Sequence, residues 1–285
     1  MKRLCYYHSK DPDGWVSGAI VKRKYSDIEL RGWDYKDPIP PIEEIIKYDE
    51  VILIDITFPL NVLQEIGRAT NLTVIDHHVS FNNEIKKCVD TFFKYIYNHN
   101  KSACEIGWEY YFPETPTPYG VLLNGRYDTF RKNEGDWENE TLPFKYFLTS
   151  VCNSVDSVPE GIFFSSKEYI NDKWCQIGKG IMSYVDTMNK TYTKFNHFVV
   201  EKAFGKYKAL CLNYYPFNSE VMKSIWDPMK YDIMIGFCFD GSKYSVSLRS
   251  VDENPDVSVI AKERGGGGHR NAAGFETTEL SSVFK

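Results

Sequence analysis

The chain contains 285 residues, of which 42% are hydrophobic and 26% are charged, which is an ordinary composition for a globular protein. Its formal net charge of -5 argues against a long nucleic acid duplex as the main partner, because proteins that follow a duplex need a basic surface. A small anionic ligand, held by a few local cations, is compatible with this charge. The length exceeds what one hydrophobic core usually serves, so we expect two domains.

The cysteines favour a reducing compartment. There are seven, an odd number, and none forms a C-x-x-C pair, which disfavours a disulfide framework and a zinc–cysteine site. Residues 1–7 include two basic residues but no long apolar run follows, and no stretch reaches the ~18 apolar residues of a membrane span. We therefore expect a cytoplasmic protein with no membrane partner. The cysteines are Cys5, Cys88, Cys104, Cys152, Cys175, Cys211 and Cys238.

The first half of the chain has the pattern of a parallel sheet interleaved with helices. Residues 4–7 predict a strand, followed by a polar loop over 8–14 and by helical spacing of Trp15, Ala19 and Ile20. Residues 51–54 and 72–75 are continuous apolar runs that predict strands, with a helix over 60–69 between them. Because these strands lack polar alternation, we expect a sheet that is covered on both faces.

Further helices follow, and they lead to the expected domain boundary. Ser102 as N-cap with Glu105 three residues later predicts a helix over 102–112. Residues 121–128 are mixed in character, and we interpret Asp128 as lying at another strand end. Apolar residues at helical spacing over 165–188 predict a long helix that leads to a boundary near residue 190. The expected domains are therefore 1–190 and 191–285.

The last third of the chain predicts a smaller α/β domain. Residues 233–239 and 244–248 read as two strands joined by Asp240-Gly241, a dipeptide that favours a tight reversing turn. Residues 256–262 predict a short helix. Four consecutive glycines, 265–268, then precede His269 and Arg270.

Polar residues at the predicted strand ends form one set of possible metal ligands. The carboxyl ends of parallel strands meet at one edge of a sheet, where ligands bind. A cluster of carboxylates and imidazoles cannot be buried there without cations, and its oxygen and nitrogen donors suit Mn²⁺ or Mg²⁺ better than structural zinc. Two such ions ~3.5–4 Å apart would activate a water for in-line attack on phosphorus. The set is His8, Asp11, Asp13, Asp55, Asp76, His77, His78 and Asp128.

The combination of motifs matters more than any single residue. An isolated Asp at a strand end is more often a helix cap than a ligand. A D-H-H tripeptide, however, is expected by chance in only about one per cent of chains of this length. Here it follows the H-S-K-D-P-D-G loop at 8–14, with Asp55 on an intervening strand.

The motifs resemble those of the DHH phosphoesterase superfamily. Residues 74–78, V-I-D-H-H, are similar to its signature, and residues 265–274, G-G-G-G-H-R-N-A-A-G, are similar to the signature of the DHH-associated C-terminal domain. Residues 244–250 resemble the strand that precedes this second signature. The resemblance implies an α/β fold with an N-terminal parallel-sheet DHH domain, a smaller C-terminal α/β domain, and an active site in the cleft between them.

The resemblance also implies a role for each residue of the set. One metal would be held by His8, Asp11 and Asp55, and the other by Asp13, Asp55, His77 and Asp128, with Asp55 bridging the two. Asp76 would orient an imidazole, and His78 would lie near the scissile phosphate as a member of the ligand shell or as the acid for the leaving group. Asp76, His77 and His78 form the expected catalytic set.

This chain departs from the family pattern in one place, and one of its motifs is short. Many relatives have three residues between the first His and the first Asp, whereas two residues separate His8 from Asp11 here. The motif around Asp128 is short, so Asp136 and Asp156 are alternatives that fit less well.

Substrate binding is assigned to the C-terminal motifs. Glycines expose backbone N–H groups to a phosphate, and arginine suits bidentate phosphate contact. We expect the second domain to hold the terminal phosphate or base while the first cuts the neighbouring bond. The residues expected to bind substrate are Arg249, Gly266, Gly267, Gly268, His269 and Arg270.

The expected function is hydrolysis of a short single-stranded oligonucleotide or a small (di)nucleotide, with two Mn²⁺ ions (or Mg²⁺) as cofactor. The nanoRNase and oligoribonuclease-like members of the family, which act as exonucleases on short substrates, are the nearest in pattern. An inorganic pyrophosphatase or exopolyphosphatase is the alternative, which the glycine run disfavours. A nucleotide-binding module without catalysis is a further alternative, which the intact acidic set disfavours. The sequence leaves the oligomeric state open, with a homodimer as one option.

Overall fold

The computed structural model describes residues 1–285 except 79–81, 86–91, 215–218 and 252–254. Two compact units make up the chain, Met1–Met182 and Ser183–Lys285. The division falls within the long helix α10 (Gln176–Asn196), which also contains residue 190. Cys88 lies outside the described residues, and the six other cysteines carry free thiols.

The N-terminal unit is built on a five-stranded sheet with the order β2-β1-β3-β4-β5. All of its strand pairs are parallel, which confirms the predicted parallel sheet. Because the strands share one direction, their carboxyl ends lie at a single edge. The strands are β1 (Arg3–His8), β2 (Glu29–Trp33), β3 (Glu50–Ile54), β4 (Asn71–Asp76) and β5 (Lys94–Tyr97).

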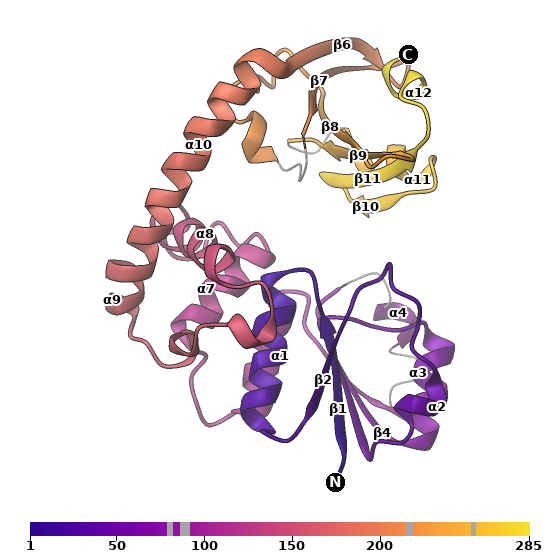
Figure 1. Cartoon of the computed structure of the whole chain (residues 1–285), viewed down its shortest axis with the longest axis vertical. Helices are drawn as coiled ribbons and strands as arrows, with labels where there is room; N and C mark the ends of the chain where they lie inside the picture. Colours follow the sequence, from indigo (N-terminus) through magenta and orange to yellow (C-terminus); the bar gives the residue numbers. More distant parts are fainter. Residues whose placement is uncertain (79–81, 86–91, 215–218, 252–254) are drawn as a thin grey trace. The chain divides into compact units, whose positions relative to one another are not determined.

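Helices cover both faces of this sheet. Side chains of β1, β3 and β4 alternate between two hydrophobic cores, so that Ile52 and Ile54 enter one core while Val51 and Leu53 enter the other. Figure 1 shows α1 on one side of the sheet and α2, α3 and α4 on the other. The first core contains residues of α1 (Pro12–Lys24), α6 (Ala103–Tyr111), α7 (Tyr119–Asp128) and α8 (Leu142–Val151). The second face carries α2 (Ile42–Ile45), α3 (Leu60–Ala69) and α4 (Asn82–Ile85).

One expected strand end is wrong. Asp128 is the last residue of helix α7, not the end of a strand. Pro118 stands just before the helix with a φ of -59°, which suits a helix start. Within α7 the polar sequence Asn124-Gly125-Arg126 interrupts the apolar run, so no buried β-strand could form there.

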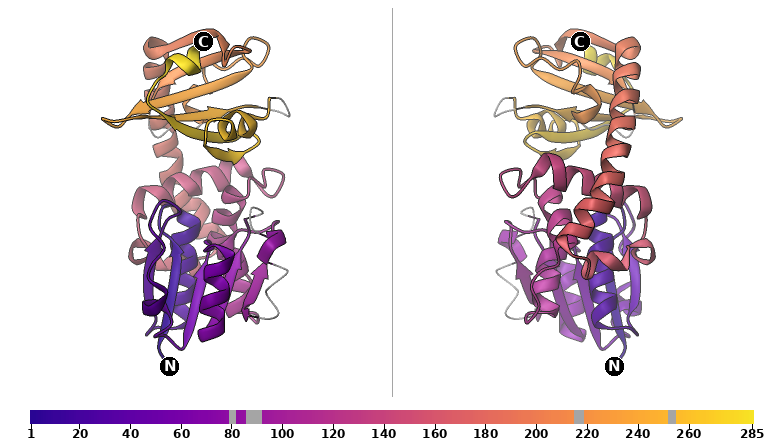
Figure 2. Two further views of the ribbon diagram at one scale, coloured as in Figure 1. Left: turned by 90° about the vertical axis from the view of Figure 1, so that its right-hand side faces the viewer. Right: turned by 90° about the vertical axis from the view of Figure 1, so that its left-hand side faces the viewer.

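Several other local predictions are confirmed. Helix α3 has the predicted bounds, and α6 begins with the predicted capping box of Ser102 and Glu105. The segment predicted as a helix over 165–188 is helical for longer, because α10 continues to Asn196, and Figure 2 shows it as a continuous helix. Short helical segments precede it: η2 (Trp137–Thr141), η3 (Val155–Ser157), η4 (Glu160–Phe163), α9 (Lys167–Tyr169) and η5 (Ile170–Cys175). In the part of the chain that the structure describes, no helix combines the length and apolar character needed to cross a membrane.

The C-terminal unit contains a mixed six-stranded sheet with the order β10-β11-β9-β8-β7-β6. Only β7 and β8 run parallel, and the predicted hairpin is confirmed as β8 and β9. The predicted short helix is α11 (Val257–Lys262), capped by Asp256. Helices α11 and α12 (Ser281–Phe284) pack on one face of the sheet, and η6 (Ser219–Met222) packs on the other. The strands are β6 (His197–Ala203), β7 (Tyr207–Asn213), β8 (Ile233–Phe239), β9 (Tyr244–Arg249), β10 (Gly267–His269) and β11 (Ala272–Thr277).

Candidate metal centre

Histidine and aspartate side chains converge at the carboxyl edge of the N-terminal sheet. His8 ends β1, Asp55 directly follows β3, and Asp76 ends β4. The strand order places β3 between β1 and β4, so Asp55 is the central member. Its Oδ2 lies 3.6 Å from His8 Nδ1, and its Oδ1 lies 3.4 Å from Nε2 of His77.

Asp55 is held in a conformation that suggests a functional demand. Its φ of 62° is in the left-handed region, which a non-glycine residue rarely adopts and which costs about 1–3 kcal/mol. The backbone is fixed there by a hydrogen bond from Asp55 N to Ile75 O (3.0 Å). The residue is 1% exposed, yet neither carboxylate oxygen accepts a hydrogen bond of regular geometry from the described residues. A buried carboxylate of this kind is costly unless a cation compensates it.

One ligand group lies on the His8 side of Asp55. Possible ligand atoms of His8, Asp11 and Asp55 all lie within 4.8 Å of one another. Asp11 also caps helix α1 by accepting a hydrogen bond from Gly14 N (3.0 Å). A Cβ on Gly14 would come 2.0 Å from the carbonyl oxygen of His8, so only glycine allows the helix to start so close to the strand. Burial lowers the pKa of His8, but the carboxylates of Asp11 and Asp55 outweigh it and raise the pKa to about 11.

A second group lies on the His77 side. Possible ligand atoms of Asp13, His77 and Asp128 lie within 4.8 Å of one another. His77 Nε2 is 3.4 Å from Asp128 Oδ2 and 3.9 Å from Asp13 Oδ2. One oxygen of the Asp55 carboxylate therefore faces each group.

Asp13 is fixed by the N-terminus of helix α6. Its Oδ2 accepts a hydrogen bond from Ala103 N (2.8 Å), and its Oδ1 accepts bonds from Cys104 N (3.2 Å) and Asn124 Nδ2 (3.3 Å). Burial, followed by the charge of Asp55, nevertheless raises the pKa of Asp13 to about 7. Asp128 has its pKa raised by burial and by the charges of Asp13 and Asp55. At Asp13 and Asp128, burial and repulsion between acids therefore exceed what their neighbours compensate, which favours a bound cation. At Asp55, burial is outweighed by His77 and His8, which lower its pKa.

Asp76 organises the two histidines that follow it. Its Oδ1 accepts hydrogen bonds from the backbone N–H groups of His77 (2.7 Å) and His78 (3.2 Å), and it lies 2.7 Å from His78 Nδ1. This arrangement fixes the orientation of the His78 ring, with Nε2 on the side of the ring that faces away from Asp76. Burial lowers the pKa of each histidine, but the nearby carboxylates prevail and raise both to about 9.

Asp34 and Tyr35 belong to the same cluster, although the sequence pattern did not single them out. They follow β2, which pairs with β1 at its side. Asp34 Oδ1 lies 3.6 Å from His8 Nε2, while the Nδ1 of the same ring faces the ligand group. The Tyr35 ring meets His8 edge-on, with centroids 6.1 Å apart. The available signal was a carboxylate directly after the short run E-L-R-G-W at 29–33.

The two alternatives to Asp128 lie elsewhere. Asp136 accepts a hydrogen bond from Asn139 N (2.9 Å) and so caps η2. Asp156 is paired with Lys22 at 2.7 Å on the surface. Neither belongs to a described group that could hold a metal ion.

The residues expected to bind substrate lie together in the C-terminal sheet. Ala272 pairs with both Arg249 and His269, so the three side chains share one face of the sheet. Arg249 donates a hydrogen bond to Leu248 O (2.8 Å), and burial lowers its pKa. His269 is exposed, and Arg270 in the following turn lies 3.8 Å from Asp256.

The second half of the glycine run belongs to strand β10 (Gly267–His269), and close packing requires two of the four glycines. A Cβ on Gly266 would come 2.1 Å from Gly274 O, and one on Gly268 would come 2.6 Å from Ala272 O. Gly268 also has a φ of +136°. A Cβ on Gly267, in contrast, would meet nothing within 4 Å. Gly267 is therefore the member of the strand that leaves space beside the backbone.

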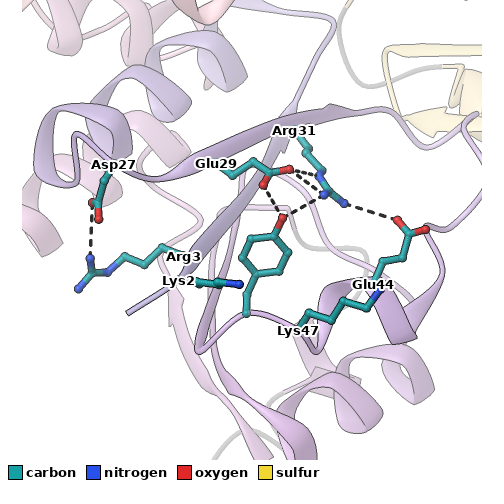
Figure 3. A pocket seen from close by; sticks show the side chains of 8 residues that line it. Lys2, Arg3, Asp27, Glu29, Arg31, Glu44 and Lys47 are labelled. Atoms are coloured by element: carbon teal, nitrogen blue, oxygen red, sulfur yellow. Dashed lines mark hydrogen bonds and ion pairs between the residues drawn. The ribbon is translucent and has the colours of Figure 1, made fainter.

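A charged cavity of about 410 Å³ lies at the opposite, amino-terminal edge of the N-terminal sheet. Figure 3 shows its central arginine, Arg31, surrounded by partners. Arg31 donates to Glu29 Oε1 (2.8 Å) and to the hydroxyls of Tyr48 (3.1 Å) and Tyr6 (3.3 Å). The cavity is lined by Lys2, Arg3, Asp27, Glu29, Arg31, Glu44, Lys47 and Tyr48.

Comparison of the sequence with known proteins finds a relative of low identity. No family model matches the chain. The uncharacterized protein R106 of Acanthamoeba polyphaga mimivirus is 27% identical over 238 residues, which are 81% of this chain and 53% of that protein. The chain thus spans about half the length of the curated relative it matches.

Solved structures cover nearly the whole chain. The DHH domain of a protein described as belonging to a family of ribosomal proteins has a TM-score of 0.58 at 14% identity, over 97% of this chain and 82% of that one. The pGpG-specific phosphodiesterase PggH of Vibrio cholerae has a TM-score of 0.52 at 15% identity, over 99% and 95%. RecJ of Thermus thermophilus in complex with Mn²⁺ has a TM-score of 0.50 at 12% identity, over 99% and 50%. The expected α/β fold is confirmed, and it is the fold of a DHH-domain protein.

Proposed function

We propose that this chain, which has the DHH-domain fold, is a metal-dependent phosphoesterase that hydrolyses short oligonucleotides or small (di)nucleotides. One observation carries the proposal: the buried Asp55 carboxylate has one oxygen toward each of two ligand groups, and the described residues satisfy neither oxygen with a regular hydrogen bond. Such an arrangement fits a pair of divalent cations, which is the usual centre for in-line displacement at phosphorus.

The residues of the chain fit this pair of ions. His8, Asp11 and Asp55 would hold one ion, and Asp13, His77 and Asp128 would hold the other together with Asp55, whose Oδ1 lies 3.4 Å from His77 Nε2. All of these donors are oxygen or imidazole nitrogen, which suits Mn²⁺ or Mg²⁺. When bound, the two ions would acidify the attacking water and neutralise charge that develops on the phosphoryl oxygens.

Asp76 and His78 would deliver the proton that the leaving group needs. Asp76 holds Nδ1 of His78, so that Nε2 is the nitrogen that can reach a substrate. In the structure the nearby carboxylates hold the pKa of His78 at about 9, and a protonated imidazole is an effective acid toward a leaving alkoxide. Asp76 would keep the ring in the orientation that this transfer requires.

The C-terminal unit would supply affinity for the nucleotide. Arg249 and His269 share one face of its sheet. On the same face, two residues further along the three paired strands, lie Ser247, Gly274 and Gly267. A guanidinium beside small residues and open backbone suits a phosphate group. Arg270, Gly266 and Gly268 would complete this site, the two glycines by letting β10 close onto β11. Either Arg249→Ala or His269→Ala should raise KM more than it lowers kcat.

A substrate panel tests the proposal. Purified protein with Mn²⁺ would be incubated with a dinucleotide, a five-nucleotide RNA, a cyclic dinucleotide, 3′-phosphoadenosine 5′-phosphate and pyrophosphate, and the products separated by chromatography. Mononucleotide release from the short linear substrates would support exonuclease activity of the nanoRNase kind. Phosphate from pyrophosphate alone would instead indicate a pyrophosphatase, and nucleotide binding without turnover would indicate a binding module.

A further inference from the structure

Tyr35 places a hydroxyl group beside the carboxylate cluster. It follows β2 by two residues, and its ring packs edge-on against His8 (6.1 Å) and against Trp33 (5.3 Å). Its hydroxyl accepts a hydrogen bond from Thr57 N (3.3 Å), two residues after Asp55. The ring and the hydroxyl are thus fixed from two strand ends, β2 and β3.

The hydroxyl retains a proton to donate. Among the described residues its one hydrogen bond is the one that it accepts from Thr57, so its own hydrogen is not used in that contact. A phenol is neutral at physiological pH and therefore carries this proton. Tyr35 as a whole residue is 46% exposed, so the rest of the fold does not enclose it.

A neutral donor has a clear use in this place. The ligand groups around Asp55 consist of carboxylates, which only accept hydrogen bonds when ionised, and of imidazoles, of which His8 and His77 would be committed to the metals and His78 to the leaving group. An anionic phosphate that enters such a cluster meets repulsion except where cations or donors face it. Tyr35 offers an uncharged donor at the margin of the cluster.

We propose that the Tyr35 hydroxyl donates a hydrogen bond to a phosphoryl oxygen of the phosphoester bound at this centre. The inference rests on the proposed function, because it assumes that a phosphate occupies the site beside Asp55. Tyr35 neither takes nor gives up a proton in the reaction. It strengthens phosphate binding and fixes the orientation of the phosphoryl group for attack.

The test uses Tyr35→Phe, with Tyr48→Phe as the matched control. Both substitutions remove one phenolic hydroxyl, but Tyr48 lies at the amino-terminal edge, where its hydroxyl contacts Arg31 and Glu29. Binding of inorganic phosphate to the Mn²⁺-loaded full-length protein would be measured by calorimetry, together with Mn²⁺ affinity. Because the hydrogen bond has a charged acceptor, we expect Tyr35→Phe to weaken phosphate binding about 10- to 100-fold. Mn²⁺ affinity should be unchanged, and Tyr48→Phe should leave both quantities unchanged.

Each result separates the inference from the proposed function. Unchanged phosphate affinity in Tyr35→Phe, or an equal loss of Mn²⁺ affinity, would overturn the inference, since the second result assigns Tyr35 to the support of His8. Failure of the Mn²⁺-loaded wild type to bind phosphate would also overturn it. Phosphate binding that depends on Tyr35, in a protein that hydrolyses nothing in the substrate panel, would uphold the inference and reject the proposed catalysis.

Discussion

The two edges of the N-terminal sheet both gather charged side chains, but they treat those charges in opposite ways. At the amino-terminal edge, Arg31 contacts Glu29, Tyr48 and Tyr6, so its donors are satisfied by neighbours. At the carboxyl edge, both oxygens of Asp55 are buried and accept no regular hydrogen bond from the described residues.

The difference separates a structural network from a binding site. The amino-terminal cavity pairs cations with acids at the surface, where such pairs contribute about 0–1 kcal/mol each to stability. The carboxyl edge instead collects acids and imidazoles, with a left-handed Asp55 at its centre. A protein keeps strain and unsatisfied carboxylates of this kind where a ligand compensates them. We therefore assign function to the carboxyl edge of the sheet and not to the cavity at its amino-terminal edge.

The largest expected effect comes from Asp55→Asn. Asparagine tolerates the left-handed backbone and keeps the shape of the side chain, but it removes the charge that would bridge two cations. We expect hydrolysis to fall by on the order of 10²- to 10³-fold or more. We also expect the rise in Tm on addition of Mn²⁺ to disappear. Retention of that rise with full activity would remove Asp55 from the metal centre.

The affinity for Mn²⁺ should rise with pH. In the metal-free structure Asp13 has a pKa of about 7 and His77 a pKa of about 9, so both carry a proton that competes with the metal at lower pH. Displacement of the His77 proton by the metal contributes about 100-fold to the rise in affinity between pH 6 and pH 8, and displacement of the protons of Asp13 and His8 adds to it. Calorimetry in buffers of different ionisation enthalpy would detect the released protons. A pH-independent affinity would show that these groups are not ligands.

Asp34→Asn should have an intermediate effect. Asp34 faces Nε2 of His8, while Nδ1 faces Asp11 and Asp55, so loss of its charge should weaken the hold on the ring. Changes to such supporting groups typically cost about 10- to 100-fold in metal affinity. Asp27→Asn, at the amino-terminal edge, is the matched control and should leave Mn²⁺ affinity unchanged. Equal behaviour of the two variants would argue that Asp34 has no part in the centre.

The smallest effect is expected from Glu29→Gln. The substitution weakens the contact with Arg31 while preserving the size of the side chain. Because Glu29 and Arg31 are partly exposed, the free energy of unfolding should fall by about 1 kcal/mol or less. Activity should not change. A large loss of activity would mean that the amino-terminal edge has a role beyond stability.

The buried strands and the acids that follow them could be predicted because burial on both faces leaves a clear apolar run. Residues 51–54 and 72–75 carry that pattern, so Asp55 and Asp76 stood out as polar residues at strand ends. Strand β2 lies at the edge of the sheet and has the sequence E-L-R-G-W, with exposed positions, so it lacked the apolar run. Asp34 and Tyr35 were missed for that reason.

Long-range placement was harder to predict than local structure. Asp128 reaches the cluster from the last residue of a helix, and no pattern near it in the sequence indicates the distance to His77. The same holds for the contact of Asp13 with the N-terminus of α6, which joins residues about 90 positions apart. The glycine run was predicted to bind a ligand, and its sequence did not indicate that Gly266 and Gly268 also pack closely against residues of β11.

The most direct test compares wild type with Asp55→Asn in a single assay. Both proteins would be incubated with Mn²⁺ and a dinucleotide, with and without a chelator, and mononucleotide release would be followed over time. We expect release by wild type with Mn²⁺ alone, and loss of that release both in the variant and with the chelator. Equal release by the two proteins, or release that persists in the chelator, would contradict a metal-dependent phosphoesterase centred on Asp55.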